Sequence, residues 1–342
     1  MRWTDKIAAI DTLDSRMFDT PLVDEMQHFA LAHEPRTLRF STPTFLDYDS
    51  DDVRGCSRNS FPAFSISGPA CALNCDHCQA NILAPMIAAT TPDMLDRRVR
   101  DLILMQDLKG FLLSGGSNRR NEIRYERFLP IVERLKRDYP HLKIALHTAL
   151  TDATRARAME AAGVDTVMMD VIGATETVRE VYHLDRPVGD FEASLAALSA
   201  TGMSVVPHIV IGLHYGRLRG EAQALAICAR HAIDALVLVV VMPQHARPGT
   251  FAVPSTGDVG QVFLEARRRL PSTPVLLGCA RPPGMHRRVT DAYAVMAGLD
   301  GIAFPAEGTV TVARVIGRPF EQQHACCSVR LGDGTGLHAG AC

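Results

Sequence analysis

The sequence predicts an α/β protein built on a (β/α)8 barrel of the TIM type, complete or nearly so. Short apolar runs alternate with segments that carry apolar residues at helical spacing, which is the pattern of parallel strands joined by crossover helices. Several runs are almost wholly apolar, as at 235–241, which suits strands buried on both faces. The chain has 342 residues, 47% of them hydrophobic. That is enough for a barrel, which typically takes about 250 residues.

Eight strands are expected, at residues 63–67, 110–114, 143–147, 166–170, 204–211, 235–241, 274–278 and 301–304. Helices are expected at 92–108, 125–139, 152–162, 190–201, 220–232, 258–270 and 287–299, where acidic residues occur near the starts. The barrel therefore spans 61–305. Residues 1–60 form an N-terminal extension of mixed helical and loop character. Residues 306–342 form an extended C-terminal tail, which carries Cys326 and Cys327 and is expected to lie over the barrel mouth.

Charge and hydropathy exclude several classes of partner. The formal net charge of −2 gives no electrostatic footprint for nucleic acid or for an anionic membrane. The longest apolar stretch, at 235–243, is far shorter than the ~20 residues of a membrane span. The N-terminus has no apolar signal core. We expect a cytoplasmic protein, in which the nine cysteines are thiols or metal ligands rather than disulfides.

The most informative segment is the run Cys-Ala-Leu-Asn-Cys-Asp-His-Cys at 71–78. Its C-x3-C-x2-C spacing lets one loop place the thiolates of Cys71, Cys75 and Cys78 on three corners of a cubane iron–sulfur cluster. The fourth iron would have no protein ligand and would be open to chemistry. The alternative is a zinc site, which needs a fourth ligand that usually comes from a second C-x2-C or H-x3-H pair. The sequence has no such pair, although His77 lies inside the motif.

This loop resembles the cluster loop of the radical S-adenosylmethionine (SAM) superfamily. The resemblance implies a [4Fe–4S] cluster on the three catalytic cysteines, with the amino and carboxylate groups of SAM on the open iron. It also implies that cluster and SAM together generate a 5′-deoxyadenosyl radical, which abstracts hydrogen from unactivated carbon. His77, inside the loop, would then contact the cofactor.

Barrel enzymes carry their chemistry at the carboxyl ends of the strands. The second predicted strand ends in Ser114, Gly115 and Gly116, and in radical SAM enzymes a Gly-Gly segment here receives the SAM amino group. The acid that usually follows the two glycines is Ser117 here, which departs from the family pattern. The later strand ends contribute further candidate cofactor contacts, each of which could instead be a core or turn residue: His147, Asp170, Ile211 and Met242.

Residues 177–213 resemble the region between the fourth and fifth strands of biotin synthase. By this resemblance Arg186 binds SAM and Asp170 contacts its ribose. The planar fork of an arginine suits the SAM carboxylate. A surface ion pair of Arg186 with Asp185 or Glu180 is the alternative.

The cysteine loop, the run Leu-Gly-Cys-Ala-Arg-Pro at 277–282 and the spacing across the barrel look most like the two-component lipoyl synthases. In these, two related radical SAM subunits insert two sulfurs into a protein-bound octanoyl chain. The partners implied are an octanoylated lipoyl-carrier protein or peptide, a second radical SAM subunit and a ferredoxin or flavodoxin. The N-terminal C-x4-C-x5-C motif of single-chain lipoyl synthase does not occur here.

Sulfur insertion in this group consumes a second, auxiliary cluster. We hypothesise that Cys279, Cys56 and one or both of Cys326 and Cys327 bind it, and the alternative is that these are incidental thiols. Cys228 lies on the apolar stripe of a predicted helix and is assigned to the core. Two other functions stay open. One is a different reaction of the biotin-synthase-like group, such as biotin-type sulfur insertion, rearrangement or methylation. The other is a non-catalytic Fe–S partner subunit.

Overall fold

The structure is a computed structural model that describes residues 1–42, 61–105, 108–323 and 328–329. Within these residues the strands form one sheet of 11 members in which every neighbouring pair is parallel. The order is β11-β1-β10-β9-β8-β7-β6-β5-β4-β2-β3. The strands are β1 Leu38–Ser41, β2 Ala63–Ser65, β3 Ile87–Ala88, β4 Gly110–Ser114, β5 Lys143–Thr148, β6 Thr166–Asp170, β7 Ser204–Ile211, β8 Leu236–Val240, β9 Val275–Leu277, β10 Gly301–Ala303 and β11 Phe320–Gln323.

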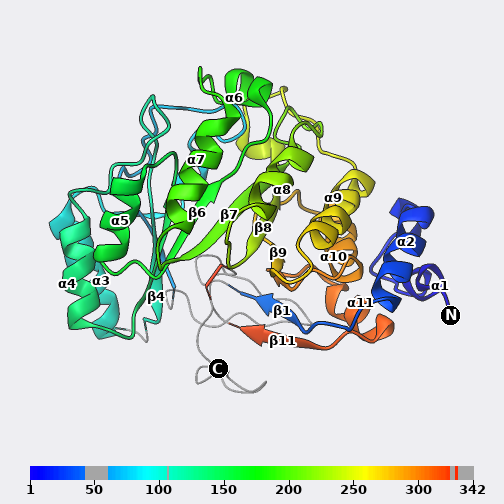
Figure 1. Cartoon of the computed structure of the whole chain (residues 1–342). Helices are drawn as coiled ribbons and strands as arrows, with labels where there is room; N and C mark the ends of the chain where they lie inside the picture. The colour runs from blue at the N-terminus through cyan, green and yellow to red at the C-terminus, as the bar shows by residue number, and fades with distance from the viewer. Residues whose placement is uncertain (43–60, 106–107, 324–327, 330–342) are drawn as a thin grey trace.

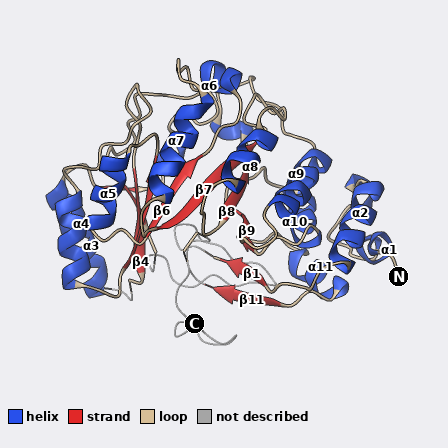
Figure 2. Ribbon diagram, viewed as in Figure 1, coloured by secondary structure: helices blue, strands red, loops and turns tan. Residues whose placement is uncertain are grey.

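The helices form a layer on the outer face of the curled sheet (Figures 1 and 2). They are α1 Trp3–Ala8, α2 Thr20–Leu31, α3 Pro92–Met105, α4 Leu129–Asp138, α5 Ala153–Ala161, α6 Thr175–Val181, α7 Val188–Ser199, α8 Glu221–Ala229, α9 Thr256–Arg269, α10 Met285–Met296 and α11 Thr309–Ile316. Three short 3-10 helices are η1 Ser15–Met17, η2 Asn81–Leu83 and η3 Pro243–His245. Helices α1 and α2 pack beside α9, α10 and α11. Asp152 and Ser255 cap α5 and α9 by accepting hydrogen bonds from backbone N–H groups of the first turn.

The predicted fold class is confirmed as α/β with a single parallel sheet, and all eight predicted strands are present as β2 and β4 to β10. Closure of the barrel is not observed in the described part of the chain, where β3 and β11 are the two edges of the sheet. The sheet also extends beyond 61–305. Strand β1, from the predicted N-terminal extension, pairs with β10 and with β11, and β11 comes from the predicted tail.

The inner face of the sheet is apolar toward its amino end. A buried cluster there contains one inward residue from each of several strands, including Ala145, Met168 and Val206, and Val329 is buried among them. Ser328 lines a cavity of about 350 Å³ with the strand-start residue Ser204. Ser328 and Val329, the described residues beyond β11, therefore lie at the amino end of the sheet. The predicted extended tail also contains helix α11 and strand β11. Its position over the barrel mouth stays a prediction.

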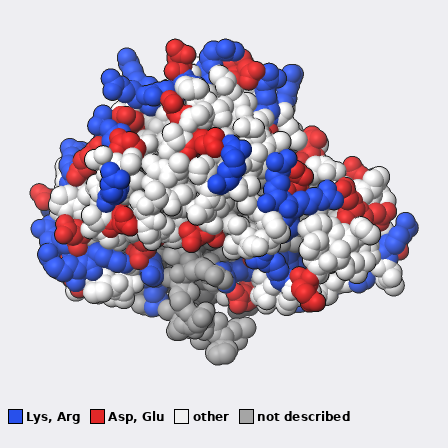
Figure 3. Space-filling model, in the orientation of Figure 1, with Lys and Arg blue, Asp and Glu red and all other residues white. Residues whose placement is uncertain are grey.

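Basic and acidic side chains are interspersed on the face shown in Figure 3. None of the helices in the described ranges is both long and apolar enough to cross a membrane.

Candidate active site

The cysteine loop follows β2 at the carboxyl end of the sheet. The backbone N–H of Ala72 donates to the carbonyl oxygen of Ser117 at 2.9 Å, and the Cys71 thiol lies 3.7 Å from the same oxygen. Cys75 is buried, whereas Cys71 and Cys78 are half-buried. The loop is therefore anchored to the segment that follows β4, the next strand of the sheet.

The three thiols are electrostatically coupled. Burial raises the pKa of the Cys75 thiol, and the charges of Cys71 and Cys78 raise it further. Burial is also the main cause of the raised pKa of Cys78. Neighbouring thiolates in such a loop need bound positive charge, which the iron of a cluster supplies. The donor set therefore fits an iron–sulfur cluster.

No group of three or more His, Cys, Asp or Glu residues in the described ranges is placed to hold a single metal ion. A cubane cluster asks for a different arrangement, because each of its three thiolates binds a separate iron.

Asp76, inside the loop, is held by two other segments. Its carboxylate oxygen Oδ1 lies 2.9 Å from Nε2 of His183 and 2.8 Å from a guanidinium nitrogen of Arg247. Its backbone N–H donates to the carbonyl oxygen of Val181 at 2.9 Å, and its own carbonyl oxygen accepts from the backbone N–H of Arg247 at 2.7 Å. These contacts join the loop to the end of α6 and to the segment after η3. The contacts of Asp76 therefore hold the loop in addition to its anchor on the segment after β4.

His77 is half-buried as a residue, but its ring nitrogen Nδ1 is buried and has no hydrogen-bond partner among the described residues. Burial lowers the pKa of His77 to about 4, so the ring is neutral. It stacks on Tyr182, with ring centroids 5.0 Å apart and planes at 27°. An unpaired buried polar atom costs stability unless a ligand pairs with it. His77 is thus placed as a cofactor contact should be, and its role remains a prediction.

The two glycines after β4 allow close packing against the cysteine loop. A methyl group on Gly116 would lie 2.0 Å from the carbonyl oxygen of Ala70 and 2.6 Å from Cα of Cys71. At Gly115 it would lie 2.7 Å from a side-chain carbon of Ile66. The backbone N–H of Gly116 already donates to the Ser67 hydroxyl at 2.7 Å. The structure thus gives the glycines a packing role that the motif alone does not reveal.

We expect Gly116→Ala to reduce the iron bound per chain and to lower the free energy of unfolding by about 1–3 kcal/mol, because the added methyl group overlaps the backbone of the loop. Gly189→Ala in α7 is the matched control, since a methyl group there meets nothing within 4 Å. Iron analysis and urea unfolding of both variants check this. Normal iron content in Gly116→Ala would contradict the packing role.

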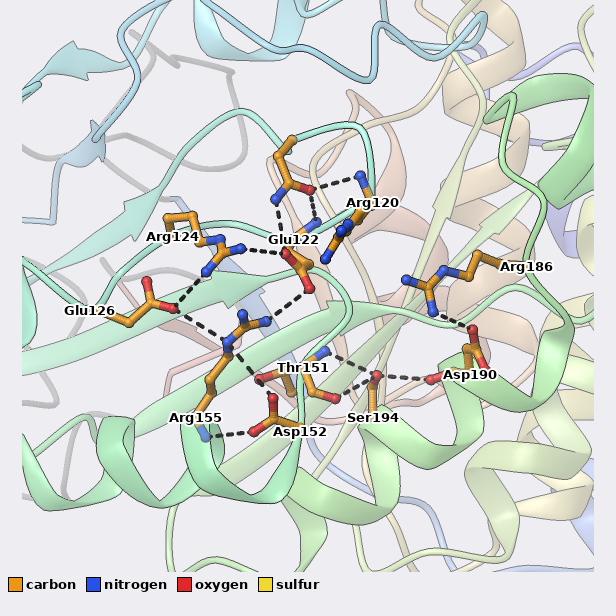
Figure 4. A network of polar contacts seen from close by, with 11 residues as sticks. Arg120, Glu122, Arg124, Glu126, Thr151, Asp152, Arg155, Arg186, Asp190 and Ser194 are labelled. Atoms are coloured by element: carbon orange, nitrogen blue, oxygen red, sulfur yellow. Dashed lines mark hydrogen bonds and ion pairs between the residues drawn. The ribbon is translucent and has the colours of Figure 1, made fainter.

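No acid follows the two glycines directly, and the nearest one along the chain, Glu122, is already paired. Its carboxylate accepts from the Asn118 amide at 2.9 Å and lies 3.1 Å from both Arg124 and Arg155 (Figure 4). The Asn118 hydrogen bond, with the two arginines, holds the pKa of Glu122 below its usual range. The Glu122 carboxylate is therefore engaged by these three side chains. It does not take the place of the acid that the family has at the position of Ser117.

Arg186 forms an ion pair, but with neither of the two acids considered from the sequence. Its guanidinium donates to Asp190 at 3.0 Å, one turn further along the chain (Figure 4). The side chain is 39% exposed. An exposed pair of this kind is worth little stability, so Arg186 can exchange Asp190 for a ligand carboxylate at small cost.

Three polar side chains lie side by side, near the carboxyl ends of β5 and β6 and in the middle of β7. Nε2 of His147 is 3.7 Å from Oδ1 of Asp170, and the rings of His147 and His208 are 5.3 Å apart and nearly perpendicular. The register pairs Asp170 with His208 across β6 and β7. Burial, followed by the charge of His147, lowers the pKa of His208 to about 4. Nδ1 of His208 donates to the carbonyl oxygen of Val206, which leaves Nε2 as an acceptor.

His208 was missed from the sequence. The available signal was a polar residue in an otherwise apolar strand, at even spacing from Val206 and Val210.

The structure places the other site residues predicted from the sequence as follows. Ser114 is buried at the end of β4, and Met242 is half-buried just after β8. Ile211 has no exposed surface and belongs to the core cluster between sheet and helices, so the structure does not place it at the site. Cys228 is buried in α8, as predicted for a core residue, and Cys279 is exposed after β9. Cys56, Cys326 and Cys327 lie outside the described residues.

Comparison with known proteins agrees with this geometry. Residues 65–218 match the family model of the Radical SAM superfamily. The match covers the three-cysteine loop and strands β3 to β7, so these residues are identified as a radical SAM domain. Such a protein is expected to use a [4Fe–4S] cluster and SAM.

The chain is also similar to a curated biotin synthase. It is 27% identical over 259 residues to the biotin synthase of Desulforudis audaxviator (strain MP104C), which covers 73% of this chain and 75% of the relative.

Two solved structures share the fold. One is the FeFe-hydrogenase maturase HydG from Carboxydothermus hydrogenoformans, with a TM-score of 0.59 and 14% identity over 95% of this chain and 76% of that one. The other is methylornithine synthase (PylB), with a TM-score of 0.55 and 12% identity over 89% of this chain and 87% of that one. At these identities the likeness concerns the fold alone.

Proposed function

We propose that this radical SAM enzyme inserts sulfur into a protein-bound octanoyl chain, as one subunit of a two-component lipoyl synthase. The observation that carries the proposal is the anchored loop of Cys71, Cys75 and Cys78 at the carboxyl end of a biotin-synthase-like sheet. The run at 277–282, which resembles lipoyl assembly, lies on β9 and the turn after it. The reaction class follows from the superfamily, whereas the octanoyl substrate rests on the sequence resemblance.

The protein's own part in the mechanism is to bind, orient and shield. A cluster and SAM bound here supply reductive cleavage of the sulfonium and hydrogen abstraction from an unreactive carbon. The three cysteines would hold the cluster. Ser114 to Gly116, His77, Asp170 and Arg186 would orient SAM around it. The buried apolar layer at the amino end of the sheet closes the floor of the site, which keeps water from entering there.

The sulfur source in this proposal is an auxiliary cluster on Cys279, Cys56 and one or both of Cys326 and Cys327. Among these, Cys279 is the described cysteine, and it lies at the carboxyl end of β9, on the same side of the sheet as the cysteine loop. Cys279→Ala should lower the iron bound per chain if this thiol is a ligand. Unchanged iron would remove Cys279 from the ligand set.

The proposed partners are an octanoylated lipoyl-carrier protein or peptide, a second radical SAM subunit for the other sulfur, and a ferredoxin or flavodoxin, all in the cytoplasm. A cavity of about 1080 Å³ beside the loop is lined by Cys71 and by two arginines and two glutamates, Arg124, Arg127, Glu122 and Glu126. It offers an electron donor an approach to the cluster.

The decisive experiment is anaerobic reconstitution followed by product analysis. With dithionite, SAM and an octanoylated carrier peptide, we expect 5′-deoxyadenosine together with a peptide that gains the mass of one sulfur atom. The same mixture without peptide is the control for uncoupled cleavage of SAM. Cleavage with no sulfur gained by the peptide, with and without the second subunit, would remove the lipoyl assignment while leaving the enzyme class intact.

A second candidate is another biotin-synthase-like reaction on a smaller, more polar substrate, by biotin-type sulfur insertion, rearrangement or methylation. It is favoured by the polar group of His147, Asp170 and His208 on strands β5 to β7, which an alkyl chain does not require. A non-catalytic Fe–S partner subunit is the remaining alternative, and the absence of 5′-deoxyadenosine under these conditions would select it.

A further inference from the structure

The hydroxyl of Tyr182 is a buried polar atom that the site does not use. Tyr182 is 5% exposed, and its Oη has no hydrogen-bond partner among the described residues. A buried hydroxyl without a partner costs roughly as much as a lost hydrogen bond. Tyr125 and Tyr293, which are also buried, use their hydroxyls, with partners at the backbone of His147 and of Asp19. Tyr182 differs from them in this respect.

The position of Tyr182 is fixed by the residues on either side of it. The carbonyl oxygen of Val181 accepts the backbone N–H of Asp76, and His183 contacts the Asp76 carboxylate at 2.9 Å. His183 has a positive φ of 56°, a strained conformation for a non-glycine residue that turns the chain at the end of α6. Both neighbours of Tyr182 are thus tied to the cysteine loop, and its ring stacks on His77 inside that loop.

The surroundings of the hydroxyl are those of the cofactor site. After burial, the charges that raise the pKa of Tyr182 are those of Asp170, Cys75, Cys78 and Cys71, in that order. The side chain is therefore near both the acid expected to meet the SAM ribose and the thiols expected to hold the cluster. The Nδ1 of the stacked His77 likewise has no hydrogen-bond partner within the described ranges. Two adjacent rings with unpaired polar atoms indicate a ligand that supplies the missing partners.

We propose that Tyr182 is a SAM-positioning residue whose hydroxyl donates a hydrogen bond to an acceptor atom of bound SAM. A phenol can donate to a carboxylate, a ribose oxygen or an adenine nitrogen, all of which SAM offers. The inference depends on the radical SAM class of the protein and not on the octanoyl substrate.

Tyr182→Phe tests this because it removes only the hydroxyl and keeps the ring that stacks on His77. In protein reconstituted to the same iron content as wild type, we expect SAM to bind about 5- to 10-fold more weakly, the effect of one hydrogen bond. Without SAM, the urea midpoint of the same protein should be unchanged or higher, because the hydroxyl has no partner to lose in the described part of the chain. The matched control is Tyr293→Phe, which removes the 2.6 Å partner of the Asp19 backbone N–H. It should lower the urea midpoint and leave SAM binding unchanged.

The measurements are equilibrium dialysis with labelled SAM, urea unfolding, and the EPR spectrum of the reduced cluster before and after SAM is added. Unchanged SAM affinity in Tyr182→Phe would overturn the proposal. A spectrum altered before SAM is added would also overturn it, because the acceptor would then belong to the cluster. Destabilisation equal to that of Tyr293→Phe would do the same by showing a partner in the SAM-free protein. If wild type itself failed to bind SAM, the enzyme class would be at fault rather than the role of Tyr182.

Discussion

Replacing Cys75 by alanine is expected to remove the cluster iron and to reduce reductive cleavage of SAM to background. Cys75 is the most buried of the three thiols in the loop, and the other two cannot hold a cubane that needs three corners ligated by protein. Cys71→Ala and Cys78→Ala should give the same result, because each thiolate binds a separate iron. Iron and acid-labile sulfide per chain, visible absorbance and 5′-deoxyadenosine formation measure the loss.

Cys228→Ala is the matched control, since Cys228 is a buried thiol in α8 without a proposed ligand role. It should keep the full iron content and lose about 1 kcal/mol of stability, the usual cost of a small change in a core. A Cys75→Ala protein that kept its iron and cleaved SAM would place the cluster elsewhere and would overturn the assignment of the loop.

The central strands could be predicted because their signal is local. The run at 204–211 is almost entirely apolar and is found as β7 with the same bounds. The edge elements have no such signal. Strand β1 reads Leu-Arg-Phe-Ser and β11 reads Phe-Glu-Gln-Gln, and each becomes a strand because it pairs with the other, far along the chain. The burial of Val329 has no local signal either, because it depends on residues from several strands.

The candidate site likewise combines features with a local sequence signal and contacts between residues far apart in the sequence. The spacing of the cysteines could be read from the sequence, and so could the strand ends that carry Asp170 and His147. The contacts that fix the loop could not, since Asp76 and His183 are 107 residues apart. The partner of Arg186 was also missed. Its partner Asp190 lies in the first turn of α7, which begins at Val188, earlier than the predicted start, whereas Arg186 precedes the helix.

Arg281, two residues after Cys279, carries the largest expected effect on stability. Its guanidinium forms a two-pronged pair with Asp291 at 2.6 and 2.8 Å, and neither side chain has exposed surface. It also donates to the carbonyl oxygens of Gly278 and Phe304. Arg281→Met should lower the free energy of unfolding by about 3–5 kcal/mol, because it leaves a buried carboxylate without its counter-charge. Urea unfolding measures the loss.

Two control variants distinguish the stability cost of leaving a buried charge unpaired from the cost of losing a contact. The double variant Arg281→Met/Asp291→Leu should recover part of the loss by removing the stranded carboxylate. Recovery stays incomplete because Gly278, Phe304 and the Ala306 backbone N–H, which donates to Asp291, lose partners. Arg269→Met, in the exposed pair with Glu265, should cost less than about 1 kcal/mol. A comparable cost at both sites would show that burial does not decide the energy of the Arg281 pair. Since this pair closes the turn that carries Cys279, any loss of iron in Arg281→Met beyond the unfolded fraction would tie the turn to a second cluster.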